Sequence, residues 1–456
     1  MKRLTFLFTV LFAIGACSGG GSSSPRAVIA PPSTGIVDVI HASADAPAVT
    51  ITVDGAPAFT DLDYTHAVAL TPNVDDISVS VDAQLPDGTA TTVIGPATIT
   101  VTETDRITAI AIGPTAAIEP LLLSQNITGI AAGEAQVRVV HAAPDAPMVD
   151  VYVSAPGTDI TTEMPLGTFE FRGVLGAVSV PAGTYQISVT LAGDPTAIVY
   201  QVEAALPADQ DVIVAATPNT GAGPSPIKLV VAPIDPSAPP AGALFSATVL
   251  DADTPTDVRV VHASPDAPNV DVIANDDFGA PAVTNLAYTE ATPFLTLPAA
   301  PINVKVVPTM ATAPVVIDED LTLPAGETLT VLAIDVLANI QPLVLTDDTR
   351  RVATEAKVRI VHASPTAGNV DIYVVAPGAD FTAATPAFTD VPLGAETGYV
   401  PLTPGDYDVV VTPTGTTTAA IGPLTISVAA SGIYTAIARD EVGIGLPLGL
   451  ILLDDF

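Results

Sequence analysis

The sequence predicts an all-β protein in which four immunoglobulin-like antiparallel β-sandwich domains follow one another along the chain. The first observation is a 17-residue motif that occurs four times, beginning at Val37, Val137, Val258 and Val358. The second is composition, because the chain is rich in Val, Thr, Ile and Pro, which favour strands and turns over helices. The third is length, since 456 residues exceed what one hydrophobic core organises. A repeat of this size indicates separate modules.

Each copy of the motif carries a histidine at the same place. The copies read VDVIHASADAPAVTITV, VRVVHAAPDAPMVDVYV, VRVVHASPDAPNVDVIA and VRIVHASPTAGNVDIYV, and their histidines are His41, His141, His262 and His362. Successive histidines lie 100, 121 and 100 residues apart. The alternation indicates that a two-domain unit of 221 residues was duplicated.

Short alternating segments separated by turns fill each copy. In the second copy we expect strands at 137–140, 149–153, 185–191, 198–204, 211–216 and 227–231, with a turn at 181–184. Six or seven strands in about 100 residues, with no helical pattern, favour a β-sandwich. The apolar run 443–453 is expected to form a buried strand.

The first residues have the pattern of an export signal. Lys2 and Arg3 precede an apolar stretch of 13 residues, too short to span a bilayer as a stable helix. Ile14-Gly15-Ala16-Cys17 resembles the lipobox of bacterial lipoproteins, which implies that Cys17 is diacylated and begins the mature protein. In Gram-negative lipoproteins an Asp directly after this cysteine resembles an inner-membrane retention signal. Ser18 at that position therefore favours the outer membrane. The alternative is an incidental cysteine in an ordinary signal peptide.

Composition sets the expected boundaries. We predict a signal peptide and lipobox at 1–17, a flexible tether at 18–35, β-sandwich domains at 36–124, 136–234, 257–347 and 357–456, and a Pro-, Ala- and Asp-rich linker at 235–256. Because this linker is the longest, the main bend of the chain is expected there. Four domains arranged end to end would reach on the order of 120 Å.

A family resemblance rests on the motif itself. VRVVHASPDAPNVDV resembles the signature of a bacterial domain-of-unknown-function family found in tandem on secreted proteins and lipoproteins. The resemblance covers residues 36–456 and implies extracellular β-sandwich modules. It implies no activity.

An arginine and an aspartate recur 12 residues apart in three copies. They are Arg138 and Asp150, Arg259 and Asp271, and Arg359 and Asp371. Both change together in the first copy, to Asp38 and Thr50, as expected of a charge pair that would leave either survivor unpaired. We therefore predict an ion pair between the two motif strands. The alternative is coincidence in one diverged copy.

The motif histidines are interpreted as structural, with ring nitrogens bonded to loop backbone. The alternative, a metal or ligand site, needs converging ligands, but the chain offers no cysteine ligands and no paired-histidine spacing. His66 receives the same structural interpretation. Asp145 and Asp266 are expected to hydrogen-bond within their own Pro-bearing turns.

The net charge of −35 excludes nucleic acid as a partner, because a phosphate backbone would be repelled. Serine-hydrolase, zinc-protease and P-loop motifs are absent from the sequence, so we expect no catalysis and no cofactor. The leading hypothesis is a lipid-anchored spacer, or a binder of extracellular protein or polysaccharide, at the outer membrane or cell surface. The alternatives are a calcium-dependent ligand binder and a hydrolase with a site at a domain junction.

Overall fold

The computed structural model describes residues 33–126, 129–234 and 242–455. The predicted signal peptide with Cys17, most of the tether and the start of the central linker therefore lie outside the described residues. All regular elements within the described ranges are β-strands or single-turn 3₁₀ helices, so the all-β prediction is confirmed.

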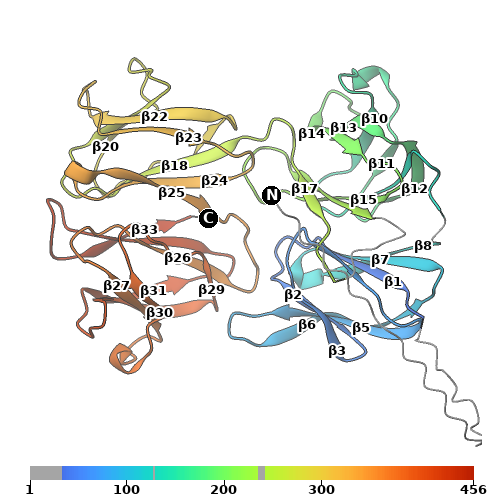
Figure 1. The fold of residues 1–456 in the computed structure, drawn as a ribbon, viewed down its shortest axis with the longest axis horizontal. Coiled ribbons are helices and arrows are strands. Elements are labelled where there is room, and N and C mark those ends of the chain that lie inside the picture. The colour runs from blue at the N-terminus through green and yellow to red at the C-terminus, as the bar shows by residue number, and fades with distance from the viewer. Residues whose placement is uncertain (1–32, 127–128, 235–241, 456) are drawn as a thin grey trace, which may run out of the picture.

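Each domain consists of two packed sheets (Figure 1). Domain 1 contains β1 (Ile36–His41), β2 (Val49–Val53), β3 (Ala56–Leu62), β4 (Ala67–Leu70), β5 (Asp75–Gln84), β6 (Ala90–Val101), β7 (Asp105–Ile112), η1 (Thr115–Ala117) and β8 (Glu119–Asn126). Domain 2 contains β9 (Glu134–His141), β10 (Val149–Ser154), η2 (Ile160–Thr162), β11 (Gly167–Phe169), β12 (Val174–Pro181), β13 (Gly183–Leu191), β14 (Ile198–Leu206), β15 (Asp211–Pro218), β16 (Ile227–Ile234) and β17 (Ala247–Val249).

The second half of the chain repeats the arrangement. Domain 3 contains β18 (Thr256–His262), β19 (Val270–Ala274), β20 (Val283–Leu286), β21 (Leu295–Leu297), β22 (Pro301–Pro308), β23 (Ile317–Thr322), β24 (Thr328–Ile334), η3 (Leu337–Asn339) and β25 (Gln341–Asp347). Domain 4 contains β26 (Ala356–His362), β27 (Val370–Val375), η4 (Phe381–Ala383), β28 (Phe388–Val391), β29 (Val400–Leu402), β30 (Gly405–Pro413), β31 (Ile421–Val428), β32 (Ile433–Arg439) and β33 (Gly449–Asp454).

The two strands of each motif belong to different sheets. In domain 1 the sheets have the strand orders β4-β1-β7-β8 and β3-β2-β5-β6. The first motif strand runs parallel to the strand beside it, β1 to β7, β9 to β15, β18 to β24 and β26 to β32, whereas the other ladders are antiparallel. The sandwiches are thus antiparallel except for this one pair in each domain.

The first motif strand is buried on both faces. Val37 and Val39 point into the sandwich of domain 1, whereas Ile40 and Ala42 join a second apolar cluster with Val140 and Ala142 of domain 2. The corresponding strands of domains 3 and 4 share a cluster in the same way, through Val261 and Val361. The domains therefore pack side by side as pairs 1–2 and 3–4 (Figure 1).

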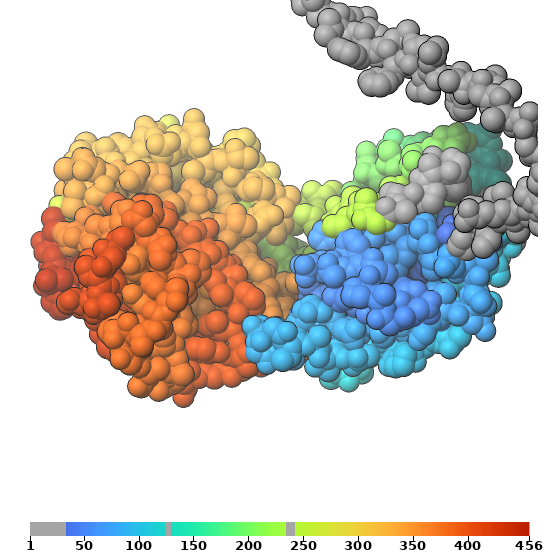
Figure 2. Space-filling model, turned by 60° about the horizontal axis from the view of Figure 1, so that its bottom comes forward, coloured from blue at the N-terminus to red at the C-terminus, as the bar shows by residue number. Residues whose placement is uncertain are grey.

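This pairing corrects the expectation of four domains arranged end to end. The physical reason is that the outward face of each first motif strand is apolar and needs a partner surface. Figure 2 shows the two pairs as separate lobes that meet in a narrower region.

The central linker is also more structured than expected. Within the described part of 235–256, Gly242 and Phe245 donate backbone hydrogen bonds to Ala69 and Ala67 of domain 1, and β17 then pairs with β16 of domain 2. Residues 242–249 thus cross from one domain of the first pair to the other. These residues, which composition assigned to the linker, instead complete existing sheet edges of domains 1 and 2 with their backbone groups.

The two pairs meet through the segment that joins domains 3 and 4. Arg350 donates to the carbonyl oxygen of Ala46 at 2.8 Å and forms an ion pair with Asp63 at 2.6 Å. Ala353 donates to the carbonyl oxygen of Asp45 at 2.8 Å. These contacts place the first motif loop of domain 1 against the second pair.

Candidate functional site

The motif histidines lie at the ends of the first motif strands, with rings turned into the loop that crosses to the other sheet. In each domain the Nε2 atom is within hydrogen-bond distance of the carbonyl oxygen six residues later. The distances are 3.1 Å for His41 to Pro47, 3.3 Å for His141 to Pro147, 3.0 Å for His262 to Pro268 and 2.7 Å for His362 to Gly368. An Nε2–H donor satisfies each carbonyl, so the ring fixes the loop that links the two sheets.

The other ring nitrogen accepts from the same loop in three domains. The amides of Ala143, Ser264 and Ser364 donate to Nδ1 at 3.4, 3.4 and 3.3 Å. Burial lowers the pKa of His41 to about 4 and lowers the pKa values of the other three motif histidines. In domains 2, 3 and 4 the neutral ring is thus bonded on both sides by backbone, as the structural interpretation requires, whereas His41 is bonded through Nε2 and its Nδ1 has no partner among the described residues.

Each motif aspartate connects an edge strand to a loop. Each is buried, and one of its carboxylate oxygens accepts from the edge strand beside it (β11, β20 or β28) while the other accepts from a loop. The donors are Thr168 Oγ1 and Gly193 N for Asp150, Asn285 N and Met310 N for Asp271, and Asp390 N and Gly415 N for Asp371. For Asp271, burial alone would raise the pKa, but the hydrogen bonds outweigh it and hold the pKa below its ordinary value.

The predicted ion pairs between motif strands are therefore wrong. Arg138 does not pair with Asp150, nor Arg259 with Asp271, nor Arg359 with Asp371. The arginines point out of the first sheet towards the neighbouring domain, whereas the aspartates lie in the second sheet. A spacing of 12 residues cannot bring them together, because the loop between them changes sheet.

Asp266, predicted to bond within its own turn, acts at longer range. Its Oδ1 atom accepts from the amide of Leu337 at 2.7 Å, and Asp45 of domain 1 accepts in the same way from Thr115 at 2.8 Å. Both donors begin the 3₁₀ turns η3 and η1, which precede the last strand of their domains. The side chain of Asp266 thus ties the motif loop to another loop, whereas the prediction for Asp145 stays a prediction.

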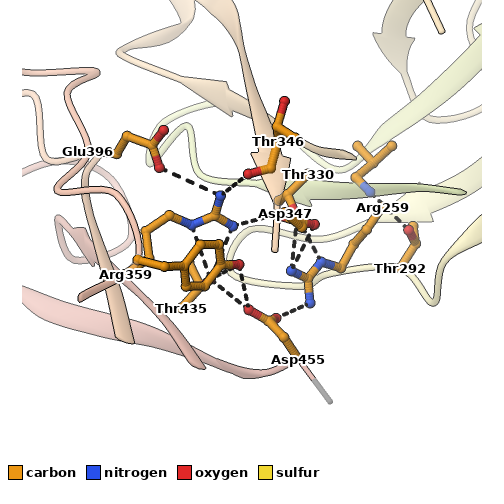
Figure 3. Close-up of polar contacts among 11 residues, drawn as sticks. Arg259, Thr292, Thr330, Thr346, Asp347, Arg359, Glu396, Thr435 and Asp455 are labelled. Carbon is orange, nitrogen blue, oxygen red and sulfur yellow. Dashed lines mark hydrogen bonds and ion pairs between the residues drawn. The ribbon is translucent and has the colours of Figure 1, made fainter. Parts of the chain in front are cut away.

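The motif arginines of domains 3 and 4 lie in a buried ionic cluster between the two domains (Figure 3). Arg359 of domain 4 pairs with Asp347 of domain 3 at 2.5 Å, and Arg259 of domain 3 pairs with Asp455 of domain 4 at 2.6 Å. Each arginine thus takes its carboxylate from the last strand of the other domain, or from the residue after it. Thr330 and Thr435 donate to Asp347 and Asp455 at 2.6 and 2.7 Å.

Aromatic rings cover the same two arginines. The guanidinium carbon of Arg259 lies 4.6 Å from the ring centroid of Phe294, and that of Arg359 lies 4.5 Å from Tyr399. Burial raises the pKa of Asp347, and the neighbouring Arg359 opposes that shift. The cluster is therefore nearly two-fold symmetric, with an arginine, aspartate, threonine and aromatic residue from each domain.

The pair 1–2 has an ionic cluster in which domain 1 carries its acidic and basic residues at exchanged positions. Arg138 pairs with Asp211 in domain 2, and Arg106 pairs with Asp38 in domain 1 at 2.5 Å. The strand registers show that Asp38 takes the place of Arg138, while Arg106 takes the place of Asp211. The charge of Arg138 acts favourably on Asp38 across the interface. Opposite charges at the two motif positions therefore attract in pair 1–2, whereas the two arginines of pair 3–4 each need a carboxylate from the other domain.

Sequence reasoning missed the carboxylates that the arginines meet. Asp347 and Asp455 each end a copy of the chain in the strings LTDD and LLDDF, a signal that a comparison of copies three and four could have found. Reversed residues at Asp38 and Arg106 could be found only with the register of two strands 68 residues apart.

The junction between the pairs carries a polar cavity of 370 Å³, lined by Asp45, Thr220, Asp257, Thr349 and Arg351 among others. Its described lining contains neither histidine nor serine. Across residues 33–126, 129–234 and 242–455, no three His, Cys, Asp or Glu side chains gather as a metal ion would need. No helix in the same ranges is long and apolar enough to cross a membrane.

These features define a class of tandem β-sandwich modules. In each module a histidine holds the motif loop by a hydrogen bond, and a buried charged residue lies on the face that packs against the partner domain. The chain belongs to the family described as "Domain of unknown function (DUF4397)", whose profile matches residues 35–152 and 256–373. Each match spans one domain and continues through the motif strands of the next, so it crosses the interface of a pair.

No curated protein matches the chain. Among solved structures, the TIE protein of Bacillus anthracis is similar over 90% of this chain and 69% of its own, with 11% identity and a TM-score of 0.15. A likeness at that score carries no argument about fold or function.

Proposed function

We propose that the chain is a lipid-anchored, non-catalytic envelope protein that presents two rigid domain pairs outside the membrane, at the outer membrane or cell surface. Attachment is through Cys17, whose sequence context resembles a lipobox. Two acyl chains anchor a protein stably without a membrane-spanning helix. Extracellular protein or polysaccharide is the kind of partner that such a surface module meets.

One observation carries the non-catalytic part of this proposal. The polar side chains repeated in the motif are bonded within the protein, the histidines to loop carbonyls and the arginines to buried carboxylates. Catalytic groups need a reacting atom within reach. Side chains bonded in this way serve the geometry of the loops and the pairing of domains.

Mass spectrometry of the mature protein, extracted from membranes, tests the anchor. We expect a diacylated Cys17 at the N-terminus, and we expect Cys17→Ser to release the protein from the membrane fraction. An unmodified thiol at the N-terminus would overturn the proposal. Small-angle scattering of the Cys17→Ser protein tests the rigid pairs, since a thin rod of about 120 Å would contradict side-by-side packing.

A further inference from the structure

Domain 2 holds an apolar cavity larger than those of domains 1 and 3. The cavity between its two sheets measures 300 Å³, whereas the corresponding cavities of domains 1 and 3 measure 70 and 90 Å³. Its walls come from β9, β10, β12, β13 and neighbouring strands, and they are almost wholly Val, Leu, Ile, Phe and Ala.

The burial of the first motif strand also differs between the domains. Val37 and Val39 of domain 1 are buried, at 2% and 7% exposure, and so are Val358 and Ile360 of domain 4. The equivalent Val137 and Val139 of domain 2 are only half-buried. Domain 3 is intermediate, with Val258 buried and Val260 half-buried, so domain 2 is the one in which both inward positions are incompletely packed. Because protein interiors are close-packed, an unfilled space of this size is strongly destabilising.

A short strand covers one edge of the sandwich. β11 pairs with β10 only from Val149 to Val151, whereas the equivalent β3 of domain 1 covers β2 as far as Val53. The equivalent strands of domains 3 and 4 also stop early, at Val272 and Ile372. Leu166, 42% exposed, lies at this edge and lines the cavity together with Val178 and Val180 of the edge strand β12.

The shape and charge of the cavity limit what can fill it. Val137 to His141 on β9 spans about 13 Å, so 300 Å³ corresponds to a slot about 5 Å across, the width of one extended chain. A cavity of about 150 Å³ accommodates benzene, so this one holds about twelve carbon atoms. No lysine, arginine or carboxylate lines it, and the chain has a net charge of −35.

From this geometry we propose that domain 2 binds a single unbranched alkyl chain of about ten to twelve carbons, its polar end uncharged and placed at the Leu166 edge. The inference goes beyond the proposed envelope role and does not depend on the lipid anchor. Alkyl chains fit because the lining is aliphatic and the slot is narrow. A carboxylate end would find no cation at the mouth and would meet the negative field of the protein.

Titration calorimetry of the Cys17→Ser protein with octanol, decanol, dodecanol and tetradecanol tests the proposal. We expect one site per chain, with affinity rising about fourfold for each added methylene and levelling off beyond about twelve carbons. Decanoate should bind more weakly than decanol. Binding at several equivalent sites, binding independent of chain length, or no saturable binding would overturn the proposal.

Cavity-filling variants locate the site. Val178→Phe should abolish decanol binding while leaving the melting temperature equal or higher, because the ring occupies empty space. Val180→Phe, at the next inward position, is a second variant if the first does not fold. Val79→Phe is the matched control in the 70 Å³ cavity of domain 1, and should lower the melting temperature while leaving decanol binding unchanged. Undiminished binding by both folded domain 2 variants would refute this location.

Discussion

Asp347→Asn removes one charge from the buried cluster between domains 3 and 4 and keeps the size of the side chain. Its partner Arg359 has a fully buried side chain, so the guanidinium would stay in the interface with only one carboxylate contact, the longer, 3.6 Å one to the half-exposed Glu396. Thr330 can still donate to the remaining amide oxygen, which confines the change to charge. Loss of one member of a buried ion pair costs about 3–5 kcal/mol.

A matched control exists at the other interface. Glu119 of domain 1 pairs with Arg172 of domain 2 at 2.6 Å, close to the Arg359–Asp347 distance, but these side chains are 40% and 58% exposed. Glu119→Gln removes the same kind of charge in water, where an ion pair contributes about 0–1 kcal/mol. The two variants therefore separate burial from distance.

Urea unfolding followed by circular dichroism measures both variants against the parent protein, with amide exchange as a local probe. We expect Asp347→Asn to shift the transition and to speed exchange in β26 and β32, while Glu119→Gln leaves both near the parent values. Equal effects of the two variants would refute the claim that the buried cluster holds the pair together.

Three further outcomes are expected. Because burial lowers the pKa of His41 to about 4, the unfolded chain takes up the proton first, and stability should fall by about 3 kcal/mol as pH decreases from 6.5 to 4. His41→Gln, which keeps a donor for the loop but does not titrate, should flatten that fall in a pH series of melting temperatures, and an unchanged slope would exclude His41 as its source. Tyr288→Phe removes the 2.6 Å hydrogen bond to the Asp440 carbonyl across the interface of domains 3 and 4, and should lower the free energy of unfolding in urea by about 1 kcal/mol. An unchanged free energy of unfolding would show that hydrogen bonds to water replace this bond. Asp271→Asn leaves one of two backbone amides, that of Asn285 in β20 or that of Met310 in a loop, without an acceptor and should cost about 1–3 kcal/mol; amide exchange at both positions that equals the parent's would argue against this role.

The strands were predictable because their signals are local. Alternation at 185–191 marks β13, and Pro181 to Thr184 marks the turn before it. The edge strands β11 and β12 were missed. They depend on neighbours for their hydrogen bonds, and β12 mixes Gly, Ala and Ser with its valines, which weakens the pattern.

The candidate site was predictable only as a set of residues. The loop contacts of the motif histidines could be predicted, because each histidine lies at a strand end and its hydrogen-bond partner is only six residues away. The motif arginines predicted ion pairs with carboxylates, but the predicted partners were wrong, since the true partners of Arg259 and Arg359 lie on another domain. One available signal was the first motif strand, whose apolar residues occupy both faces and so require cover on both sides.

Reversal of charge between Asp38 and Arg106 restricts which modules can be exchanged. A copy of domain 3 placed beside domain 2 would separate Arg259 from Asp455, and a copy of domain 1 placed beside domain 4 would separate Arg359 from Asp347. Each domain pair therefore has its own arrangement of charges at the interface, and the two arrangements are not interchangeable. Recombination that moves a whole pair would therefore preserve its interface, and recombination that moves a single domain would disrupt it.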